Sequence, residues 1–206
     1  IEELAKLPGV ISIELDDRKA ATFLDIASQA TYASSFWNSG IIGSWVDIAV
    51  VDSGVDSNHP ALQNDESGIR EIISSDFSGS GTTDDTLVHG TYVAGVIASS
   101  DNTYKGISFG VDRLINAKHV GGVRSDTLAA LDWAILNPID GAEILSNSWG
   151  YGVFDCNEMQ NINYLFDGST ISWTKYMDAA IDYYDIASVV AAGNYGFCGA
   201  KSVTAP

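Results

Sequence analysis

Three polar residues of this chain have side chains that could together hydrolyse an amide bond, and each lies beside a short apolar run. Asp52 directly follows Val46–Val51, His89 precedes an apolar segment, and Asn194 comes just after Ala187–Ala191. A carboxylate can orient a histidine, the histidine can move a proton, and a side-chain amide can stabilise an oxyanion. The combination therefore indicates a hydrolytic site, provided that the fold brings the three together.

Each of the three residues also has an ordinary structural interpretation. An aspartate at the end of a strand often caps a helix or stabilises a turn, and asparagine after glycine is common in turns. A single histidine at the start of a helix is usually structural. The chemical hypothesis for Asp52, His89 and Asn194 therefore depends on whether they meet at one edge of the fold.

The elements that would position these residues follow an alternating pattern. Four short apolar runs, rich in β-branched residues, predict buried parallel strands. They are Val46–Val51, Leu114–Val120, Ala142–Leu145 and Ala187–Ala191. Helical patterns follow at Thr91–Ser99, Ser125–Leu136 with Ser125 as N-cap, and Thr170–Tyr184. The alternation predicts a doubly wound α/β fold, with a mostly parallel sheet and helices on both faces. Functional groups in such sheets collect beyond the carboxyl ends of the strands.

Composition excludes several classes of partner. The 206 residues include 10 Lys and Arg against 27 Asp and Glu, giving a net charge of −17. Binding to nucleic acid or to an anionic membrane surface requires clustered basic residues, so both are excluded. No run of eighteen apolar residues occurs, so the sequence predicts no membrane-spanning helix.

The chain contains two cysteines, Cys156 and Cys198. They are either two separate thiols or one disulfide, and a disulfide would be typical of a secreted protein. We expect a secreted, acidic protein with this pair bonded.

Several sequence blocks are similar to those of one enzyme family. The blocks are Val50-Val51-Asp52-Ser53-Gly54-Val55-Asp56 with His59-Pro60, His89–Ala98, Ser146-Asn147-Ser148-Trp149-Gly150 and Val190-Ala191-Ala192-Gly193-Asn194. In content and order they resemble the subtilisin-like serine proteases, the subtilases. The resemblance runs from about Asp25 to Pro206 and covers roughly the first two-thirds of a catalytic domain.

The resemblance implies a role for each of the three polar residues. Asp52 would fix the tautomer of His89 and stabilise its imidazolium form. His89 would take the proton of a nucleophilic serine and return it to the leaving amine. Asn194 would donate its side-chain amide to the oxyanion. The expected activity is that of a serine endopeptidase.

The same resemblance places a substrate site around two segments. The backbone of Ser148, Trp149 and Gly150 would pair with an extended polypeptide, adding it as a strand. Trp149 would line pockets for large apolar side chains, although a tryptophan here is also compatible with ordinary core packing. Ala192 and Gly193 would lie beside the bound peptide.

The serine that the family uses as nucleophile has no counterpart in this sequence. The family carries it in a Gly-Thr-Ser motif, whereas Gly81-Thr82 is followed by Thr83 and Gly90-Thr91 by Tyr92. We therefore expect the chain to be inactive alone. It is a fragment of a complete protease, one half of a split protease, or a non-catalytic peptide-binding module.

Two further expectations concern the domain limits and the sheet edge. Residues 1–20, with the turn Leu7-Pro8-Gly9-Val10, resemble the end of a propeptide or form a plain N-terminal edge strand. Residues 21–206 would then be a partial catalytic domain. A sheet without its later strands would expose an edge, so we expect self-association and docking of the missing C-terminal part.

No metal or other cofactor is predicted. Many subtilases bind calcium through a carboxylate just after the His-Pro turn, but here Pro60 is followed by Ala61. The acidic pair Asp84-Asp85 is either a calcium ligand or part of a solvated loop, and His119 is interpreted as a surface or packed residue.

Overall fold

The computed structural model describes residues 23–65, 68–136, 141–150 and 172–194. Its strands are β1 (Asp47–Asp52), β2 (Glu71–Asp76), β3 (Arg113–Lys118), β4 (Ile144–Asn147) and β5 (Ala187–Val190). Its helices are α1 (Phe23–Ala30), α2 (Ala33–Trp37), α3 (His89–Ala98), α4 (Arg124–Leu136) and α6 (Ser172–Tyr184).

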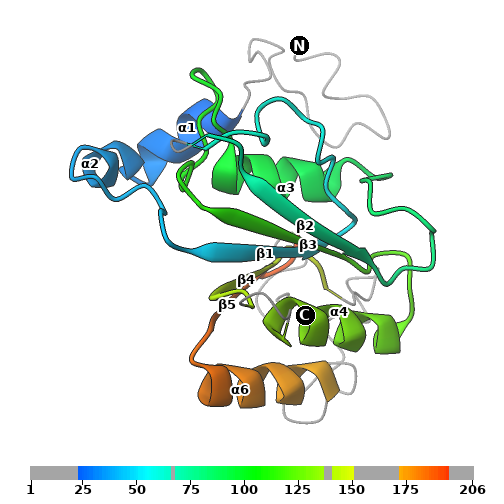
Figure 1. The fold of residues 1–206 in the computed structure, drawn as a ribbon. Coiled ribbons are helices and arrows are strands. Elements are labelled where there is room, and N and C mark those ends of the chain that lie inside the picture. Colours follow the sequence, from blue (N-terminus) through cyan, green and yellow to red (C-terminus); the bar gives the residue numbers. More distant parts are fainter. Residues whose placement is uncertain (1–22, 66–67, 137–140, 151–171, 195–206) are drawn as a thin grey trace, which may run out of the picture.

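The five strands form one sheet in the order β2-β3-β1-β4-β5, and every neighbouring pair is parallel. Figure 1 shows α3 on one face of the sheet and α4 and α6 on the other. This arrangement confirms the predicted α/β fold. Because all strands run the same way, their carboxyl ends share one edge of the sheet.

The alternation of side chains along β1 explains how the sheet holds helices on both faces. Ile48 and Val50 belong to a buried cluster with Ala94 of α3, whereas Ala49 and Val51 belong to the cluster beneath α4 and α6. Successive residues of a strand point to opposite faces, so a continuous apolar run covers both. Because β1 is buried in the centre of the sheet, the position of its last residue, Asp52, is well defined.

The structure corrects three details of the sequence-based prediction. β2 was not among the predicted strands. Its side chains are mixed in polarity, but it pairs with β3 from Glu71↔Arg113 to Asp76↔Lys118, and this pairing makes it a strand. The N-cap assignment of Ser125 was wrong, because α4 already begins at Arg124.

The third correction concerns β5, which was predicted to be buried on both faces. Val189 and Val190 are 61% and 37% exposed, and β5 pairs only with β4 among the described strands. The apolar run therefore predicted the strand β5 correctly but overestimated its burial. In the part of the chain that the structure describes, no helix is long and apolar enough to span a bilayer.

Candidate active site

Asp52 is the last residue of β1 and lies at the edge of the sheet, where its side chain is almost fully buried. One carboxylate oxygen, Oδ1, accepts the backbone N–H of Ser53 at 2.6 Å and contacts Nδ1 of His89 at 2.8 Å. Its Oδ2 is also buried and has no hydrogen-bond partner among the described residues. The negative charge of this carboxylate therefore faces His89 with little competition from other donors.

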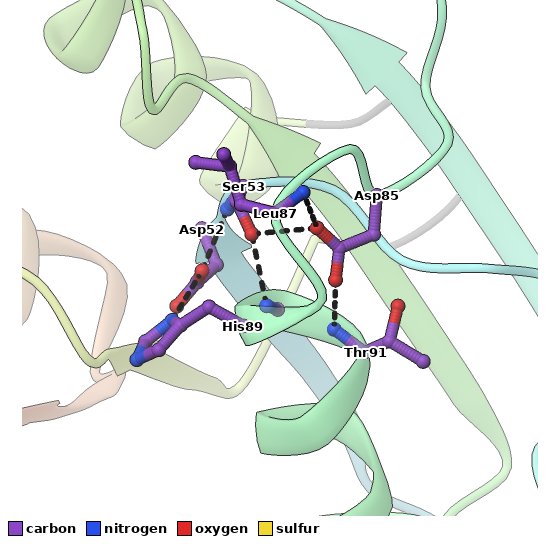
Figure 2. Close-up of polar contacts among 7 residues, drawn as sticks. Asp52, Ser53, Asp85, Leu87, His89 and Thr91 are labelled. Atoms are coloured by element: carbon purple, nitrogen blue, oxygen red, sulfur yellow. Dashed lines mark hydrogen bonds and ion pairs between the residues drawn. The ribbon is translucent and has the colours of Figure 1, made fainter.

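The imidazole of His89 is held by Asp52 on one side and open on the other. A carboxylate can only accept hydrogen bonds, so the ring nitrogen that faces it, Nδ1, carries the proton. The side chain of His89 is 53% exposed, and Figure 2 shows its second nitrogen directed away from Asp52. That nitrogen, Nε2, is thus left as an accessible base, as general base catalysis requires.

The position of His89 follows from how α3 begins. The helix starts at His89 after Val88, whose φ of 67° is left-handed, and it has no side-chain cap from Val88 itself. Instead, Ser53 Oγ accepts the N–H of Gly90 at 2.9 Å, and Asp85 Oδ2 accepts the N–H of Thr91 at 2.7 Å. First-turn N–H groups have no partner inside the helix. Side chains from outside the helix therefore anchor the turn that carries His89 (Figure 2).

Asp85 is the residue that connects this anchor to β1. Its Oδ1 accepts both the hydroxyl of Ser53 and the backbone N–H of Leu87, each at 2.9 Å. Partial burial alone would raise the pKa of Asp85, but hydrogen bonds from Thr91, Leu87 and Ser53 outweigh it and hold the pKa below its ordinary value. From sequence, Asp84-Asp85 was interpreted as a calcium ligand or part of a solvated loop. In the structure Asp84 is exposed, whereas Asp85 is half-buried and accepts hydrogen bonds from protein donors. The sequence signal for this role of Asp85 is its position four residues before His89, where a carboxylate can accept the free N–H groups of a first helical turn.

Two glycines allow close approaches at the end of β1, of α3 at Gly90 and of the preceding loop at Gly54. A Cβ on Gly90 would lie 2.1 Å from the carbonyl oxygen of Gly54 and 3.1 Å from Cβ of Asp52. Gly54 itself has a φ of +109°, and a Cβ there would lie 2.8 Å and 2.7 Å from the carbonyl oxygens of Thr83 and Asp84. A larger residue at Gly90 would push α3 away from Asp52, and a larger residue at Gly54 would displace the loop that contains Thr83 and Asp84.

The loop that contains Asp85 is fastened to β3 by two buried polar side chains. Lys118 donates from Nζ to the carbonyl oxygens of Thr82, at 3.0 Å, and Asp84, at 2.7 Å. Asn116 donates from Nδ2 to the carbonyl oxygen of Thr83 at 3.0 Å. Sequence reasoning missed both residues, because a lysine and an asparagine in an apolar run carry no signal that identifies a distant loop as their partner.

The order of the strands places Asn194 at the same edge of the sheet as Asp52. It follows β5, which is separated from β1 by β4 alone, so the two strand ends lie about 10 Å apart across the sheet. Asn194 is exposed, as are Ala192 and Gly193 before it. Because β4 lies between β1 and β5, the segment Ser148–Gly150 that follows β4 emerges between Asp52 and Asn194. The topology thus gathers all predicted site segments at one edge.

Comparison with known proteins identifies the family of this chain. A sequence profile described as the Subtilase family matches residues 43–206, which include both Asp52 and His89. The chain belongs to the subtilase family.

Named subtilases match this chain over part of their length. Subtilisin E of Bacillus subtilis (strain 168) is 31% identical over 147 residues, which cover 68% of this chain and 37% of the relative. Thermitase of Thermoactinomyces vulgaris is 30% identical over 132 residues, or 63% of this chain and 46% of the relative. The Major intracellular serine protease of Bacillus subtilis (strain 168) is 35% identical over 79 residues, or 34% of this chain and 22% of the relative. This subtilase chain therefore spans less than half the length of these relatives.

Trp149 of this subtilase packs against the core and also lies at the edge of the sheet. It is half-buried and packs against the cluster beneath α4 and α6, and its indole lies 4.6 Å from the imidazole of His119. The core interpretation and the substrate-site interpretation are therefore compatible with each other. Cys156 and Cys198 lie outside the described residues, as do residues 1–20, so the disulfide and the N-terminal segment stay predictions.

The His-Pro turn, after which many subtilases carry a calcium-binding carboxylate, is linked to its neighbours by protein hydrogen bonds in this structure. The carbonyl oxygen of Ala61 accepts the backbone N–H of Ser100 at 2.8 Å. The buried guanidinium of Arg70 donates to the carbonyl oxygens of Leu62 and Ala98. The turn is thus joined to the end of α3 by protein hydrogen bonds.

A carboxylate and a groove also lie beside the loop that follows α3. Asp101 accepts the backbone N–H groups of Thr103 and Tyr104, both at 2.8 Å, and these hydrogen bonds lower its pKa. The groove between this loop and α3 encloses about 580 Å³, and its lining includes apolar side chains such as Leu62 as well as the oxygen-bearing side chains of Ser99 and Asp101.

Proposed function

We propose that this chain supplies the acid–histidine pair and the substrate-binding edge of a serine endopeptidase. The observation that carries the proposal is the 2.8 Å contact between Asp52 Oδ1 and His89 Nδ1, with the second nitrogen of His89 open to the surface. Membership of the subtilase family supports the same function. Residues outside this sequence contribute the nucleophilic serine.

The reaction is acyl transfer followed by hydrolysis. His89 Nε2 takes the proton of the serine hydroxyl as the serine oxygen attacks the peptide carbonyl carbon. The C–N bond then breaks, and His89 gives this proton to the leaving amine, which leaves an acyl-enzyme. In the second half, His89 takes a proton from water, the resulting hydroxide attacks the ester, and the serine recovers its proton. Asp52 keeps the imidazole oriented and stabilises its protonated form throughout.

Asn194 and the segment after β4 provide substrate binding in this proposal. The exposed amide of Asn194 donates to the oxyanion of the tetrahedral intermediate, and Ala192 and Gly193 lie beside the bound peptide. The backbone of Ser148–Gly150 pairs with an extended polypeptide, as a sheet edge does. The emergence of this segment between β1 and β5 supports that placement.

A second candidate function is favoured by one observation, the lack of a Gly-Thr-Ser sequence in the 206 residues. A subtilase-like module without a nucleophile would grip extended peptides but not cleave them. One half of a split protease, completed by a second chain, would look the same in this sequence.

Labelling with a fluorophosphonate separates these alternatives. The complete protein that contains this chain should label on its serine, and the His89→Ala variant should lose labelling. As a matched control, Val111→Ala removes buried atoms near the amino end of β3, opposite the candidate site, and should retain labelling. This chain alone should stay unlabelled. A complete, folded protein that does not react with the probe would favour the peptide-binding module.

Secretion is also part of the proposal, and it does not follow from family membership. One relative is named an intracellular serine protease. The net charge of −17 supports a substrate that is a polypeptide rather than a nucleic acid or a membrane surface. Intact mass after alkylation, with and without reductant, tests the expected bond between Cys156 and Cys198.

A further inference from the structure

His119 and Trp149 form an aromatic pair at the edge of the sheet that carries the candidate site. His119 directly follows β3, and Trp149 lies two residues after β4. Their ring centroids are 4.6 Å apart and the ring planes meet at 69°, an edge-to-face arrangement. Such arrangements are preferred by aromatic rings and define the orientation of both partners.

Packing alone does not explain an imidazole at position 119. His119 is only 4% exposed, and its Nδ1 lies 3.1 Å from the hydroxyl of Thr127 on α4. Its other nitrogen, Nε2, is buried without a hydrogen-bond partner among the described residues. An aliphatic side chain would fill this space without burying a polar atom. The feature that an imidazole adds here is a flat ring that hydrogen-bonds to α4 and meets the indole of Trp149 at a fixed angle.

The imidazole is also uncharged under ordinary conditions. Burial lowers the pKa of His119 to about 4, although the nearby carboxylate of Asp126 acts in the opposite direction. A neutral ring can pack against an indole without the penalty of a buried charge. The pair is therefore compatible with a permanent structural contact at neutral pH.

We propose that His119 is a positioning residue that determines substrate selectivity, because its ring fixes the indole of Trp149 as one wall of the pocket for a substrate side chain. The proposal rests on the proposed function, in which Ser148–Gly150 binds an extended polypeptide. His119 lies behind Trp149 in the core and acts through it. The ligand class is thus a polypeptide with a large side chain at the position that meets Trp149.

The physical consequence is a change in pocket depth when the imidazole is lost. His119→Ala leaves space behind the indole, so the ring can tilt inward and the pocket can accept larger side chains. Peptides with a large aromatic residue should then gain relative to peptides with a small aliphatic one. The expected change in the ratio of their kcat/KM values is about 3-fold to 10-fold, the range expected for loss of an aromatic pair.

The first test uses this chain and a spectroscopic signal. The chain has five tryptophans, so the near-UV circular dichroism of Trp149 is taken as the difference between the wild type and Trp149→Phe. His119→Ala should lose most of that difference signal, and Thr127→Val, which removes the hydroxyl next to Nδ1, should lose part of it. His119→Phe restores an aromatic edge and should keep the signal. An unchanged difference signal in His119→Ala would overturn the proposal.

The second test uses the complete protease and a peptide series in which one side chain varies from Ala to Trp. His119→Ala should change the ratio between large and small substrates, whereas His119→Phe should keep the wild-type ratio. Val111→Ala is the control for a purely structural role, and it should affect all peptides equally. If His119→Ala also changes kcat/KM by the same factor for all peptides, His119 does not determine selectivity, although the complete protein is still a protease. If the wild-type complete protein does not react with a fluorophosphonate, the proposed function fails instead.

Discussion

Asp85 and Thr91 are joined by a 2.7 Å hydrogen bond from the backbone N–H of Thr91 to the Asp85 carboxylate. This bond spans the start of α3, so a loop residue before the helix determines where the helix begins. The same carboxylate accepts the hydroxyl of Ser53, the residue next to Asp52. The orientation of His89 toward Asp52 therefore depends on a residue that touches neither of them.

Removal of the Asp85 carboxylate should destabilise the first turn of α3. We expect Asp85→Ala to lower the free energy of unfolding by about 1 kcal/mol, the usual effect of losing a helix cap. Hydrogen exchange at the amides of Gly90 and Thr91 should accelerate. Asp85→Asn keeps one acceptor oxygen and should show a smaller effect on both quantities. Equal exchange rates in the wild type and Asp85→Ala would contradict this role.

Lys118 should be essential for holding the loop that contains Asp85. Lys118→Met has a similar shape but leaves the carbonyl oxygens of Thr82 and Asp84 without their buried donor. Each unsatisfied buried acceptor costs about 1–3 kcal/mol, so we expect the free energy of unfolding to fall by at least about 1 kcal/mol in urea titrations. Lys175→Met, at an exposed position of α6, is the matched control and should change it by less than about 0.5 kcal/mol.

Asp52→Asn should leave the fold intact but remove the fixed tautomer of His89. An amide can either donate or accept, so Nδ1 of the imidazole no longer has to carry the proton. In the isolated chain, the proton NMR signal of the His89 Nδ1–H group should disappear from the low-field region. In the complete protease, kcat should fall by about 10⁴-fold. Asp178→Asn, exposed on α6, is the control, and a retained low-field signal in Asp52→Asn would argue against the pair.

Acid should destabilise the wild type more than a variant without His119. Because burial lowers the pKa of His119 from 6.5 to about 4, the unfolded state binds the proton more readily than the folded state between these values. Above pH 6.5 the imidazole is neutral in both states, so the free energy of unfolding has its full value. As the pH falls to about 4, protonation of the imidazole in the unfolded state lowers the free energy of unfolding by at most about 3 kcal/mol.

Urea unfolding at pH 7 and pH 4 measures this difference. The wild type should lose more stability across that range than His119→Val, by up to about 3 kcal/mol. The remaining carboxylates and histidines titrate in both proteins, so their effects cancel in the comparison. Parallel losses in the two proteins would mean that His119 does not contribute to the acid sensitivity.

Self-association should occur through the exposed edge of β5. Val189 is 61% exposed on a strand that pairs, among the described strands, with β4 alone, and exposed apolar edges recruit further strands. Light scattering of this chain should show a mass that rises with concentration, and Val189→Lys should keep it monomeric. Val123→Lys changes a residue that is 66% exposed but lies in a loop, so it should not prevent association. A wild-type chain that is monomeric at every concentration would contradict the prediction.

The sequence by itself determined the fold class and the pair at the centre of the site. Continuous apolar runs indicated buried parallel strands, and the carboxyl ends of parallel strands share one edge, which made a meeting of Asp52 and His89 possible. The resemblance of the blocks around these two residues to subtilase sequences implied that they form a pair. Apolar runs and short motifs are local features of a sequence, so they can be recognised without a structure. β2 escaped detection because its residues have no clear alternation and its strand conformation depends on pairing with β3.

Only the tertiary structure decided which polar groups hold the pair in place. Lys118 binds a loop more than thirty residues away, and Asp85 reaches Ser53 across a similar separation. The burial of His119 against Trp149 also depends on the packing of β3, β4 and α4. Hydrogen bonds between distant segments leave no periodic trace in the sequence, because any donor can satisfy a backbone carbonyl and only the packed chain determines which donor is near.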